Sequence, residues 1–322
     1  MEEQVMGKKD DITKDYMSDN ERFADVFNYL IYDGKQVIKK DDLTEKDPTE
    51  LTILNNGNDI FSKQKMRDVL KQCIVKKSGD ITYVLMGIEN QSDIHYAMVI
   101  KNLLYDTLNY ASQADKISAV HKKNKDLRKD EFLSHFAKTD RIYPVITLTL
   151  YWGTEKWDAP VRLSDMFPPG IPEEIIAYTN DYTINLITPD RIKDYGKFST
   201  EIGDVLEFIA RSKEVDVMEK MIKERNGNWT LNRESVNVIN TMTGAGFTPQ
   251  DEADEEVDMC IATQSLINKG ISQGISQGIS QGENRLTELF KKIQSNPEEM
   301  NRALNADEKE RQEMYRQYGI IE

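Results

Sequence analysis

Three polar residues in the first third of the chain, Asp68, Glu89 and Gln91, lie on either side of a predicted strand turn. Asp68 lies near the start of a segment rich in β-branched residues. Glu89 and Gln91 follow a second segment of the same kind. Two carboxylates that converge can hold Mg²⁺, which prefers oxygen ligands, and an amide beside them can position a water molecule. Metal-dependent hydrolysis of phosphodiester bonds uses such a set of groups. We therefore take these three residues as candidates for that chemistry.

A hairpin would bring the two carboxylates together. Residues 65–75 and 81–88 are rich in β-branched and aromatic residues, and the Lys-Lys-Ser-Gly-Asp between them is typical of a turn. If the chain turns near Ser78, Asp68 lies ten residues before that point and Glu89 eleven residues after it. Antiparallel pairing then makes the two side chains neighbours.

A cation would stabilise this arrangement. Like charges opposite one another destabilise a sheet, and a bound divalent metal removes the repulsion. If the second strand continues, Glu89 and Gln91 project to the same face, and the main-chain carbonyl of Asn90 lies between them as a further ligand. The alternative is that Glu89 and Gln91 only end the strand while Asp68 faces solvent, because isolated carboxylates are common.

The elements around this hairpin alternate between helix and strand. Residues 20–31 carry apolar side chains at helical spacing, with Ser18 or Asp19 placed as the N-cap. The strand 81–88 is apolar on both faces, which is typical of a central strand in a covered sheet. The other expected elements are helices at 94–111, 204–211 and 215–224 and a buried strand at 142–151. This order predicts an α/β fold in which helices flank a mixed sheet.

Charge is distributed unevenly along the chain. The net charge of −14 argues against a nucleic-acid partner, because phosphate binding usually requires an excess of Lys and Arg. Residues 60–141, however, contain 15 Lys and Arg against 10 Asp and Glu, a balance of +5 that leaves −19 elsewhere. This segment holds the candidate site and a basic run formed by Lys122, Lys123, Lys125, Arg128 and Lys129. A solvated helix face explains the basic run equally well.

The bulk composition favours a cytoplasmic protein that does not enter a membrane. The chain of 322 residues is long enough to bury a core, and 39% of its residues are hydrophobic. Its two cysteines, Cys73 and Cys260, form neither a disulfide framework nor a metal-ligand spacing. No apolar run approaches the roughly 18 residues that a membrane span requires.

The sequence divides into three predicted parts. Residues 1–17 are expected to be a polar tail, residues 18–245 the α/β domain, and residues 246–322 an acidic linker followed by a helical region. Residues 270–281 are three copies of Gly-Ile-Ser-Gln. Period four places the isoleucines on one helical stripe that suits self-association, so a homo-oligomer is expected. Each interior glycine costs a helix about 1 kcal/mol, so a flexible linker is an alternative.

Several segments resemble the Rpn family of recombination-promoting nucleases, also called putative transposases, within the PD-(D/E)XK nuclease superfamily. The similarity extends over residues 18–211. The segments that carry it are Arg67-Asp68-Val69, Gly87-Ile88-Glu89-Asn90-Gln91, His95-Tyr96-Ala97-Met98, Phe23-Ala24-Asp25-Val26-Phe27-Asn28 and Tyr143-Pro144-Val145-Ile146. The resemblance implies a restriction-endonuclease-like core of a mixed sheet flanked by helices, followed here by the helical C-terminal extension.

The resemblance also implies roles for single residues. Asp68 and Glu89 become ligands of Mg²⁺ or another divalent cation such as Mn²⁺. Gln91 falls where the wider superfamily has its lysine, so it orients water, or Lys101 on the following helix supplies the missing positive charge. A solvated helix lysine is the plainer interpretation of Lys101.

The superfamily often adds an acidic residue from its first helix. Asp25 fits this role, and Glu21, one turn earlier on the same face, is the alternative. Asn28 shares that face as well. An ordinary exposed helix carboxylate explains either acid equally well.

These observations lead to one functional hypothesis and one competitor. The first is a Mg²⁺-dependent DNA endonuclease that promotes recombination in mobile-element biology or phage defence, a purpose implied by the resemblance alone. The competitor is a catalytically weak or inactive nuclease fold that binds DNA or protein as a regulator.

Overall fold

The computed structural model describes residues 2–46, 68–77, 80–248 and 255–321. The chain forms two compact units, Met1–Met259 and Cys260–Glu322. The beginning of the predicted hairpin at 65–67, the predicted turn at Ser78 and most of the predicted acidic linker lie outside the described residues. Among the described residues, no helix is long and apolar enough to cross a membrane.

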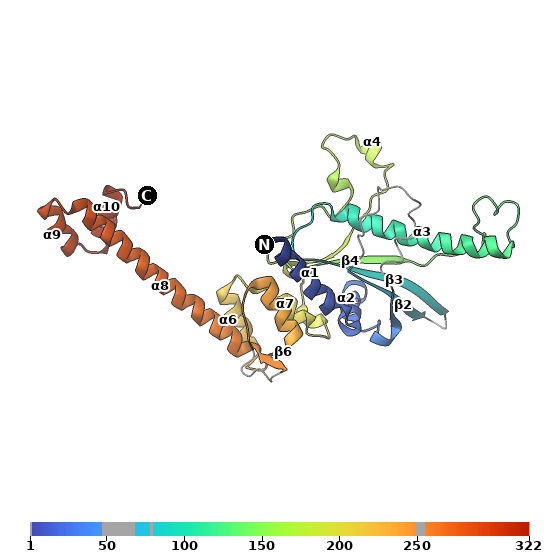
Figure 1. Ribbon diagram of the computed structural model, residues 1–322, viewed down its shortest axis with the longest axis horizontal. Helices are drawn as coiled ribbons and strands as arrows, with labels where there is room; N and C mark the ends of the chain where they lie inside the picture. The colour runs from blue at the N-terminus through green and yellow to red at the C-terminus, as the bar shows by residue number, and fades with distance from the viewer. Residues whose placement is uncertain (1, 47–67, 78–79, 249–254, 322) are drawn as a thin grey trace. The chain divides into compact units, whose positions relative to one another are not determined.

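A five-stranded mixed sheet is the centre of the first unit (Figure 1). Its strands, in spatial order, are β1 (Leu43–Glu45), β2 (Val69–Lys77), β3 (Asp80–Gln91), β4 (Val145–Tyr151) and β5 (Asn185–Ile187). The first three pair in antiparallel fashion, whereas β3, β4 and β5 run parallel. The predicted mixed sheet is therefore confirmed, with the apolar strand β3 at its centre.

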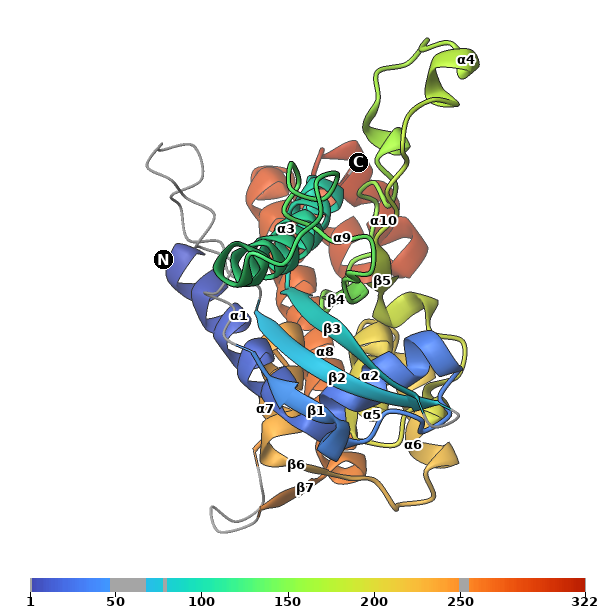
Figure 2. The ribbon, with the colours of Figure 1, turned by 90° about the vertical axis from the view of Figure 1, so that its right-hand side faces the viewer.

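Helices cover both faces of this sheet. Figure 1 shows α3 (Met98–Asn124) on one face and α1 (Glu2–Ser18) and α2 (Asn20–Tyr32) on the other, and Figure 2 shows the same layers turned by 90°. On the face of α1 and α2, Lys71 of β2 is buried, and its ammonium donates to the main-chain carbonyl of Ser18 and, at 2.5 Å, to Asn20 Oδ1. This bond ties the junction of the two helices to the sheet.

The predicted first helix corresponds closely to α2. Asp19 is its N-cap, and the carboxylate accepts hydrogen bonds from the main-chain amides of Glu21 and Arg22 at 3.0 and 2.9 Å. The predicted helix at 94–111 is also present, but α3 begins at Met98 and continues for 27 residues, well beyond the predicted end.

The N-terminal segment differs from its prediction. Residues 1–17 are expected to be a polar tail, yet Glu2–Ser18 forms helix α1, with Thr13, Tyr16 and Met17 buried. The Tyr16 hydroxyl lies 2.9 Å from Ser235 Oγ, and its ring meets the Trp152 ring edge-on. Eight of residues 1–17 are charged, which explains why the composition of the segment suggests a tail.

The rest of the first unit is mostly helical. Its elements are α4 (Glu173–Ile176), α5 (Ile202–Arg211), α6 (Val215–Glu224), α7 (Arg233–Thr243) and the small antiparallel pair β6 (Thr230–Asn232) and β7 (Glu256–Asp258), together with the 3₁₀ turns Lys40–Asp42, Ser164–Met166, Pro189–Arg191 and Tyr195–Lys197. The helices predicted at 204–211 and 215–224 are confirmed as α5 and α6. The buried side of α5, from Ile202 to Ile209, is part of the core.

The second unit contains one long helix and a small helical cap. Helix α8 (Met259–Ile293) passes through all three repeats, so they form helix rather than linker. The two short helices α9 (Pro297–Asn305) and α10 (Glu308–Gln317) follow it. Their core consists of Leu289, Ile293, Ala303, Ala306, Met314 and Tyr315. The repeat isoleucines are half exposed or more, and self-association through them stays a prediction.

Candidate active site

The hairpin register places Asp68 beside Glu89. Strands β2 and β3 pair with Val69 opposite Ile88, and one further step of the same register puts Asp68 opposite Glu89. A hydrogen bond of 2.7 Å from the Asn90 main-chain amide to Asp68 Oδ2 holds the aspartate at this point. The predicted neighbourhood of the two carboxylates is therefore confirmed, and the predicted continuation of the strand through Gln91 is confirmed too.

Glu89 is the more deeply buried of the two carboxylates and has a lysine beside it. Its side chain has 0% exposure, and Lys101 Nζ, from the first turns of α3, lies 2.7 Å from Glu89 Oε2. The Lys101 side chain is itself only 21% exposed. An ion pair taken out of water in this way holds its geometry strongly, because removing one partner would leave the other charge buried without compensation.

The electrostatic setting of Asp68 opposes its ionisation. Burial raises the pKa of the Asp68 carboxyl above its ordinary value, and the Asn90 amide and the Lys101 charge lower it in part. Asp10 and Lys14 act on the same carboxyl from a distance, the first raising its pKa and the second lowering it. A carboxylate in this state gains from a bound cation, which would favour the ionised form.

Helix α1 contributes an acid that the sequence did not single out. Asp10 accepts a hydrogen bond of 3.3 Å from the hydroxyl of Ser92, the residue after β3. Burial is the main cause of its raised pKa, and the Lys101 charge lowers it. The i, i+4 spacing of Ile12 with Tyr16 and of Thr13 with Met17 is the signal that could have revealed the helix on which Asp10 stands.

Asp25 does not occupy the place predicted for it. Its carboxylate is buried and accepts hydrogen bonds of 2.7–3.0 Å from the main-chain amides and hydroxyls of Ser199 and Thr200, and one of 3.1 Å from Gln36. These donors occupy both oxygens. Asp25 therefore holds the segment that leads into α5, and its predicted role as an assisting catalytic acid is corrected.

The two other polar residues of α2 are structural as well. Glu21 is exposed at the surface and pairs with Lys40 at 2.5 Å. Asn28 is fully buried, and its amide joins the main chain of Ile38 in both directions at 2.8 Å. The face predicted from spacing is real, but it packs on other parts of the chain.

Asn90 and Gln91 complete the candidate site. The Asn90 side chain is turned toward the core, where its Oδ1 accepts from Trp152 Nε1 at 3.0 Å. Its main-chain carbonyl accepts from Gln91 Nε2 at 2.7 Å. A carbonyl oxygen can accept a second partner, so it remains suited to a cation. The bond also orients the Gln91 amide.

The donor set fits a magnesium ion that keeps part of its water shell. Asp68, Glu89 and the Asn90 carbonyl supply hard oxygen ligands, and Mg²⁺ in proteins is usually held by one or two carboxylates with several waters. In the part of the chain that the structure describes, no group of three or more His, Cys, Asp or Glu side chains gathers as a metal cluster. The site therefore suits a partly hydrated ion and lacks the ligands of a closed zinc site.

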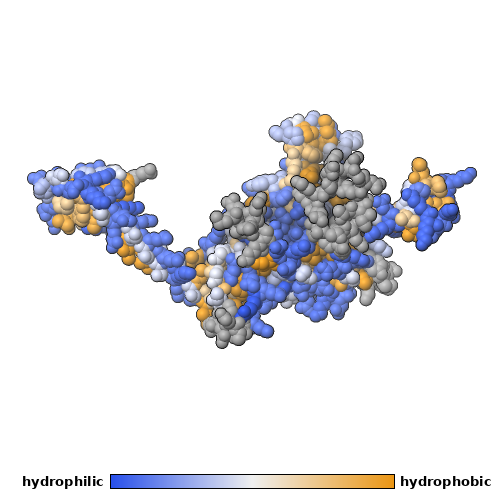
Figure 3. All heavy atoms as spheres, viewed as in Figure 1, coloured by the Kyte–Doolittle hydropathy of each residue, from blue (hydrophilic) through white to orange (hydrophobic). Residues whose placement is uncertain are grey.

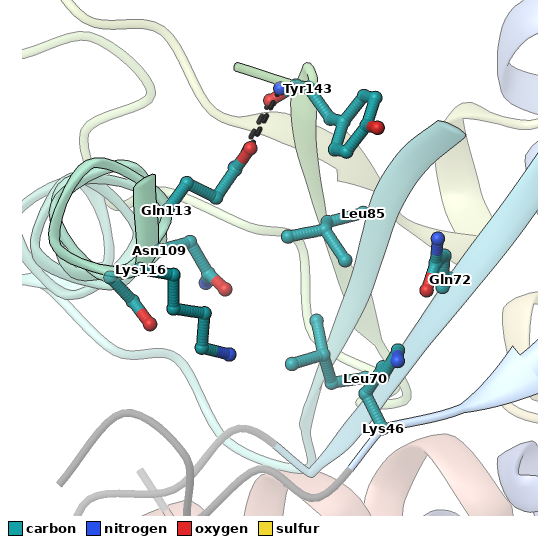
Figure 4. A pocket seen from close by; sticks show the side chains of 9 residues that line it. Lys46, Leu70, Gln72, Leu85, Asn109, Gln113, Lys116 and Tyr143 are labelled. Carbon is teal, nitrogen blue, oxygen red and sulfur yellow. Dashed lines mark hydrogen bonds between the residues drawn. The ribbon is translucent and has the colours of Figure 1, made fainter. Parts of the chain in front are cut away.

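A cavity of about 250 Å³ opens between α3 and the sheet (Figure 4). It includes Leu70 of β2, two residues after Asp68 in the chain, and Lys116, whose side chain points into the space from α3. The other lining residues are Lys46, Gln72, Leu85, Asn109, Ser112, Gln113 and Tyr143. Its lining contains two lysines and no carboxylate, so it favours an anionic group.

Comparison with known proteins identifies a family. The family described as putative transposase, YhgA-like, matches residues 10–225. No curated protein matches the chain, and neither does any solved structure. The match spans the five-stranded sheet and the hairpin with Asp68 and Glu89, and it begins at Asp10 within α1. Since it covers more than half of the sequence, the protein belongs to the YhgA-like putative transposase family.

Proposed function

We propose that this protein is a metal-dependent DNA endonuclease whose active site is formed by Asp68, Glu89 and Gln91. The observation that carries the proposal is the pair of adjacent carboxylates at the end of the hairpin, one of them fully buried. Asp10 adds a third carboxylate. All three carboxylates interact electrostatically with the ammonium of Lys101, and Asp68 also interacts with that of Lys14. Negative charge is in excess, and a divalent cation would balance it.

The fold supports the same proposal. A helix, three antiparallel strands, a second helix and a parallel strand follow one another from α2 to β4, and the strands are adjacent in that order. A mixed sheet flanked by helices is the core that the PD-(D/E)XK assignment requires. The family description supports DNA as the partner and a role in mobile-element biology.

Each residue of the site has a distinct task in this proposal. Asp68, Glu89 and the Asn90 carbonyl would hold Mg²⁺ or Mn²⁺. The bound ion would supply Lewis acidity, stabilising charge on the attacked phosphate and lowering the pKa of a coordinated water. Gln91 accepts a hydrogen bond from the attacking water and so orients it.

Lys101 supplies the positive charge that a lysine would provide at position 91 in the superfamily. Its ammonium lies 2.7 Å from Glu89 and is partly exposed, so one side faces the carboxylate while the other remains open to solvent and to substrate. A fixed ammonium beside the reacting phosphate stabilises the charge that develops in the transition state. We therefore assign it this role in place of Gln91.

Cleavage of supercoiled plasmid DNA tests the proposal. The purified full chain is expected to nick plasmid with Mg²⁺ or Mn²⁺ and to stop when the metal is chelated. Asp68→Ala and Glu89→Ala should each lower the rate at least 100-fold, whereas Asp216→Ala, at an exposed position on α6, should leave it unchanged. Cleavage that neither Asp68→Ala nor Glu89→Ala alters would refute the site.

The Lys101–Glu89 pair also favours a second candidate, a nuclease fold that binds DNA or protein without cutting. In that case the Lys101 ammonium would pair with the Glu89 carboxylate and prevent it from binding a metal ion. Calorimetric titration with Mn²⁺ separates the two. The endonuclease proposal expects binding that Asp68→Ala abolishes, whereas the second candidate expects binding only after Lys101→Met.

A further inference from the structure

The distal end of α3 and the loop that follows it form a basic arm, which we define as residues 122–141. Its seven basic side chains are all exposed: Lys122, Lys123, Lys125, Arg128, Lys129, Lys138 and Arg141. Against four acidic residues, they give the arm a charge of +3 within a chain whose net charge is −14. The arm is therefore opposite in charge to the chain as a whole.

Three of the four acidic residues of the arm, Asp126, Glu131 and Asp140, form hydrogen bonds inside the loop. The His121 ring lies between Asp126 and Asp140, with nitrogen to oxygen distances of 2.7 and 2.9 Å, and these bonds raise the pKa of the histidine. Glu131 accepts from the main-chain amides of Arg128 and Lys138 at 3.1 and 2.8 Å. No ion pair engages the seven basic side chains within the described part of the chain. All seven side chains are exposed, and one of them, Arg141, also donates to the main-chain carbonyls of Lys138 and Asp140.

An apolar tip lies among these cations. Leu133 is 94% exposed and Phe132 is 66% exposed, and the Phe132 ring meets the His135 ring edge-on at 5.3 Å. Figure 3 shows hydrophobic atoms at the end of the arm with hydrophilic atoms around them. DNA-binding proteins combine these two features, with cations on the phosphates and an apolar side chain placed against the groove or between base steps.

The length of α3 sets a distance between the arm and the candidate active site. Lys101 and Lys122 are 21 residues apart on one continuous helix, which corresponds to about 32 Å at 1.5 Å per residue. One turn of B-DNA rises about 34 Å over roughly ten base pairs. Lys116, whose side chain points into the cavity beside the sheet, lies between them. Cations thus recur along the helix over one turn of duplex.

We propose that the basic arm binds the phosphate backbone of duplex DNA about one helical turn from the bond held at Asp68 and Glu89, with Leu133 against the minor groove. The choice of DNA rests on the proposed function of that site. The contact itself depends on the exposed cations and the apolar tip of the arm. It gives an acidic protein a local surface that attracts a polyanion.

Fluorescence anisotropy with the full-length Asp68→Ala chain tests the arm without any need for cleavage. A triple variant, Lys122→Gln with Lys123→Gln and Lys125→Gln, is compared with Lys213→Gln, Lys220→Gln and Lys223→Gln, which removes the same charge elsewhere in the same unit. The arm variant should bind a 24-base-pair duplex at least tenfold more weakly, and its slope of log affinity against log salt should fall by about 2.7. The control variant should stay within about twofold.

A length series tests the distance. Affinity is measured for duplexes of 8 to 24 base pairs. It should rise steadily with length as more binding positions become available, and it should rise by an additional step beyond about 12 base pairs. The arm variant should lack this step. Leu133→Ser should weaken binding about threefold without changing the salt slope.

The outcomes for the arm and for the nuclease site are separable. Unchanged DNA affinity in the arm variant would refute the arm even in a protein that cuts plasmid. Loss of affinity in the arm variant would support the arm even if the parent protein never cuts. Loss of binding to phosphatidylserine vesicles with unchanged DNA binding would also refute it, in favour of a membrane surface.

Discussion

The two ends of helix α3 carry cations in opposite electrostatic settings. At its start, the single ammonium of Lys101 is mostly buried against Glu89, which has no exposure to solvent. At its far end, exposed cations cluster in the basic arm around His121, and water surrounds them. Coulomb interactions are weakened strongly by water and salt and much less by a protein interior.

The buried charge and the exposed charges are therefore expected to act in different ways. A charge held at 2.7 Å from a buried partner acts through its position, so one substitution should have a large effect that salt barely changes. Exposed charges act through their number, so each should matter little and salt should cancel them. Substitutions at the two ends of α3 can therefore distinguish catalysis from substrate capture.

The largest effect is expected for Lys101→Met. Removing the ammonium should lower the rate of plasmid nicking about 100-fold to 1,000-fold, the usual loss when one charge-stabilising donor is removed. Lys101→Arg keeps both the charge and the ion pair with Glu89 and should recover part of the rate. Rates measured at 50 and 200 mM salt should show the same ratio to the parent protein.

Lys220→Met, at an exposed lysine of α6, is the matched control and should cut like the parent. Nicking by Lys101→Met that equals or exceeds the parent rate would contradict the assigned role. That result would instead mean that the ammonium obstructs the carboxylate.

A smaller effect is expected for Gln91→Ala. The Gln91 amide is oriented by its 2.7 Å bond to the Asn90 carbonyl, and we assign it only the placement of a water molecule. The maximal rate should fall about tenfold while the metal concentration that gives half the rate changes little. Gln91→Lys, which introduces the lysine expected from the resemblance to PD-(D/E)XK nucleases, should cut at least as well as Gln91→Ala. A raised metal requirement would make Gln91 a ligand instead.

Asp68→Asn should change stability rather than substrate capture. Because burial raises the folded-state pKa of Asp68, ionisation costs folding stability as pH rises through that pKa, and the full cost is present above it. Without metal at pH 8, the asparagine variant should therefore unfold about 2–4 °C higher, the shift that about 1 kcal/mol produces in a domain of this size. The difference should vanish at acid pH.

Differential scanning fluorimetry with and without Mg²⁺ checks this prediction. Added Mg²⁺ should raise the unfolding temperature of the parent protein and leave that of Asp68→Asn unchanged, since only the ionised carboxylate favours the ion. An equal Mg²⁺ response in both proteins would separate Asp68 from metal binding.

The hairpin was predictable because its register depends on local chemistry. A turn sequence and two β-branched segments fix which residues lie opposite one another, so Asp68 and Glu89 could be paired from the sequence alone. The sequence offered Lys101 as a source of positive charge near the site, but it did not predict the ion pair with Glu89. The spacing of residues within a helix does not predict whether a lysine on that helix faces a strand that is distant in sequence.

The position of Asp25 could not be predicted correctly. Asp25 and Asp10 both stand on helices, and both lie near apolar positions. The choice between them depends on which helix reaches the end of β3, and that depends on long-range packing of α1 against the sheet. Asp25 instead meets Ser199 and Thr200, a contact between residues 174 and 175 positions apart.

The length of α3 was underestimated for a related reason. The apolar spacing that marks a helix fades beyond residue 111, where the helix leaves the sheet and has little to bury. Hydrophobic periodicity predicts only the part of a helix that packs on the rest of the protein. It therefore did not predict the exposed end of α3 or the basic arm.

The smallest effect is expected for a single cation of the basic arm. Lys123→Gln should weaken binding of a 24-base-pair duplex about twofold to threefold at 50 mM salt, because one phosphate contact among several is lost. At 500 mM salt the difference should disappear, since the Debye length shrinks to a few ångströms. Anisotropy titrations of the full chain at both salt concentrations measure it. A tenfold loss that persists at high salt would place Lys123 in a specific, desolvated contact, and the contrast between the two ends of α3 would then fail.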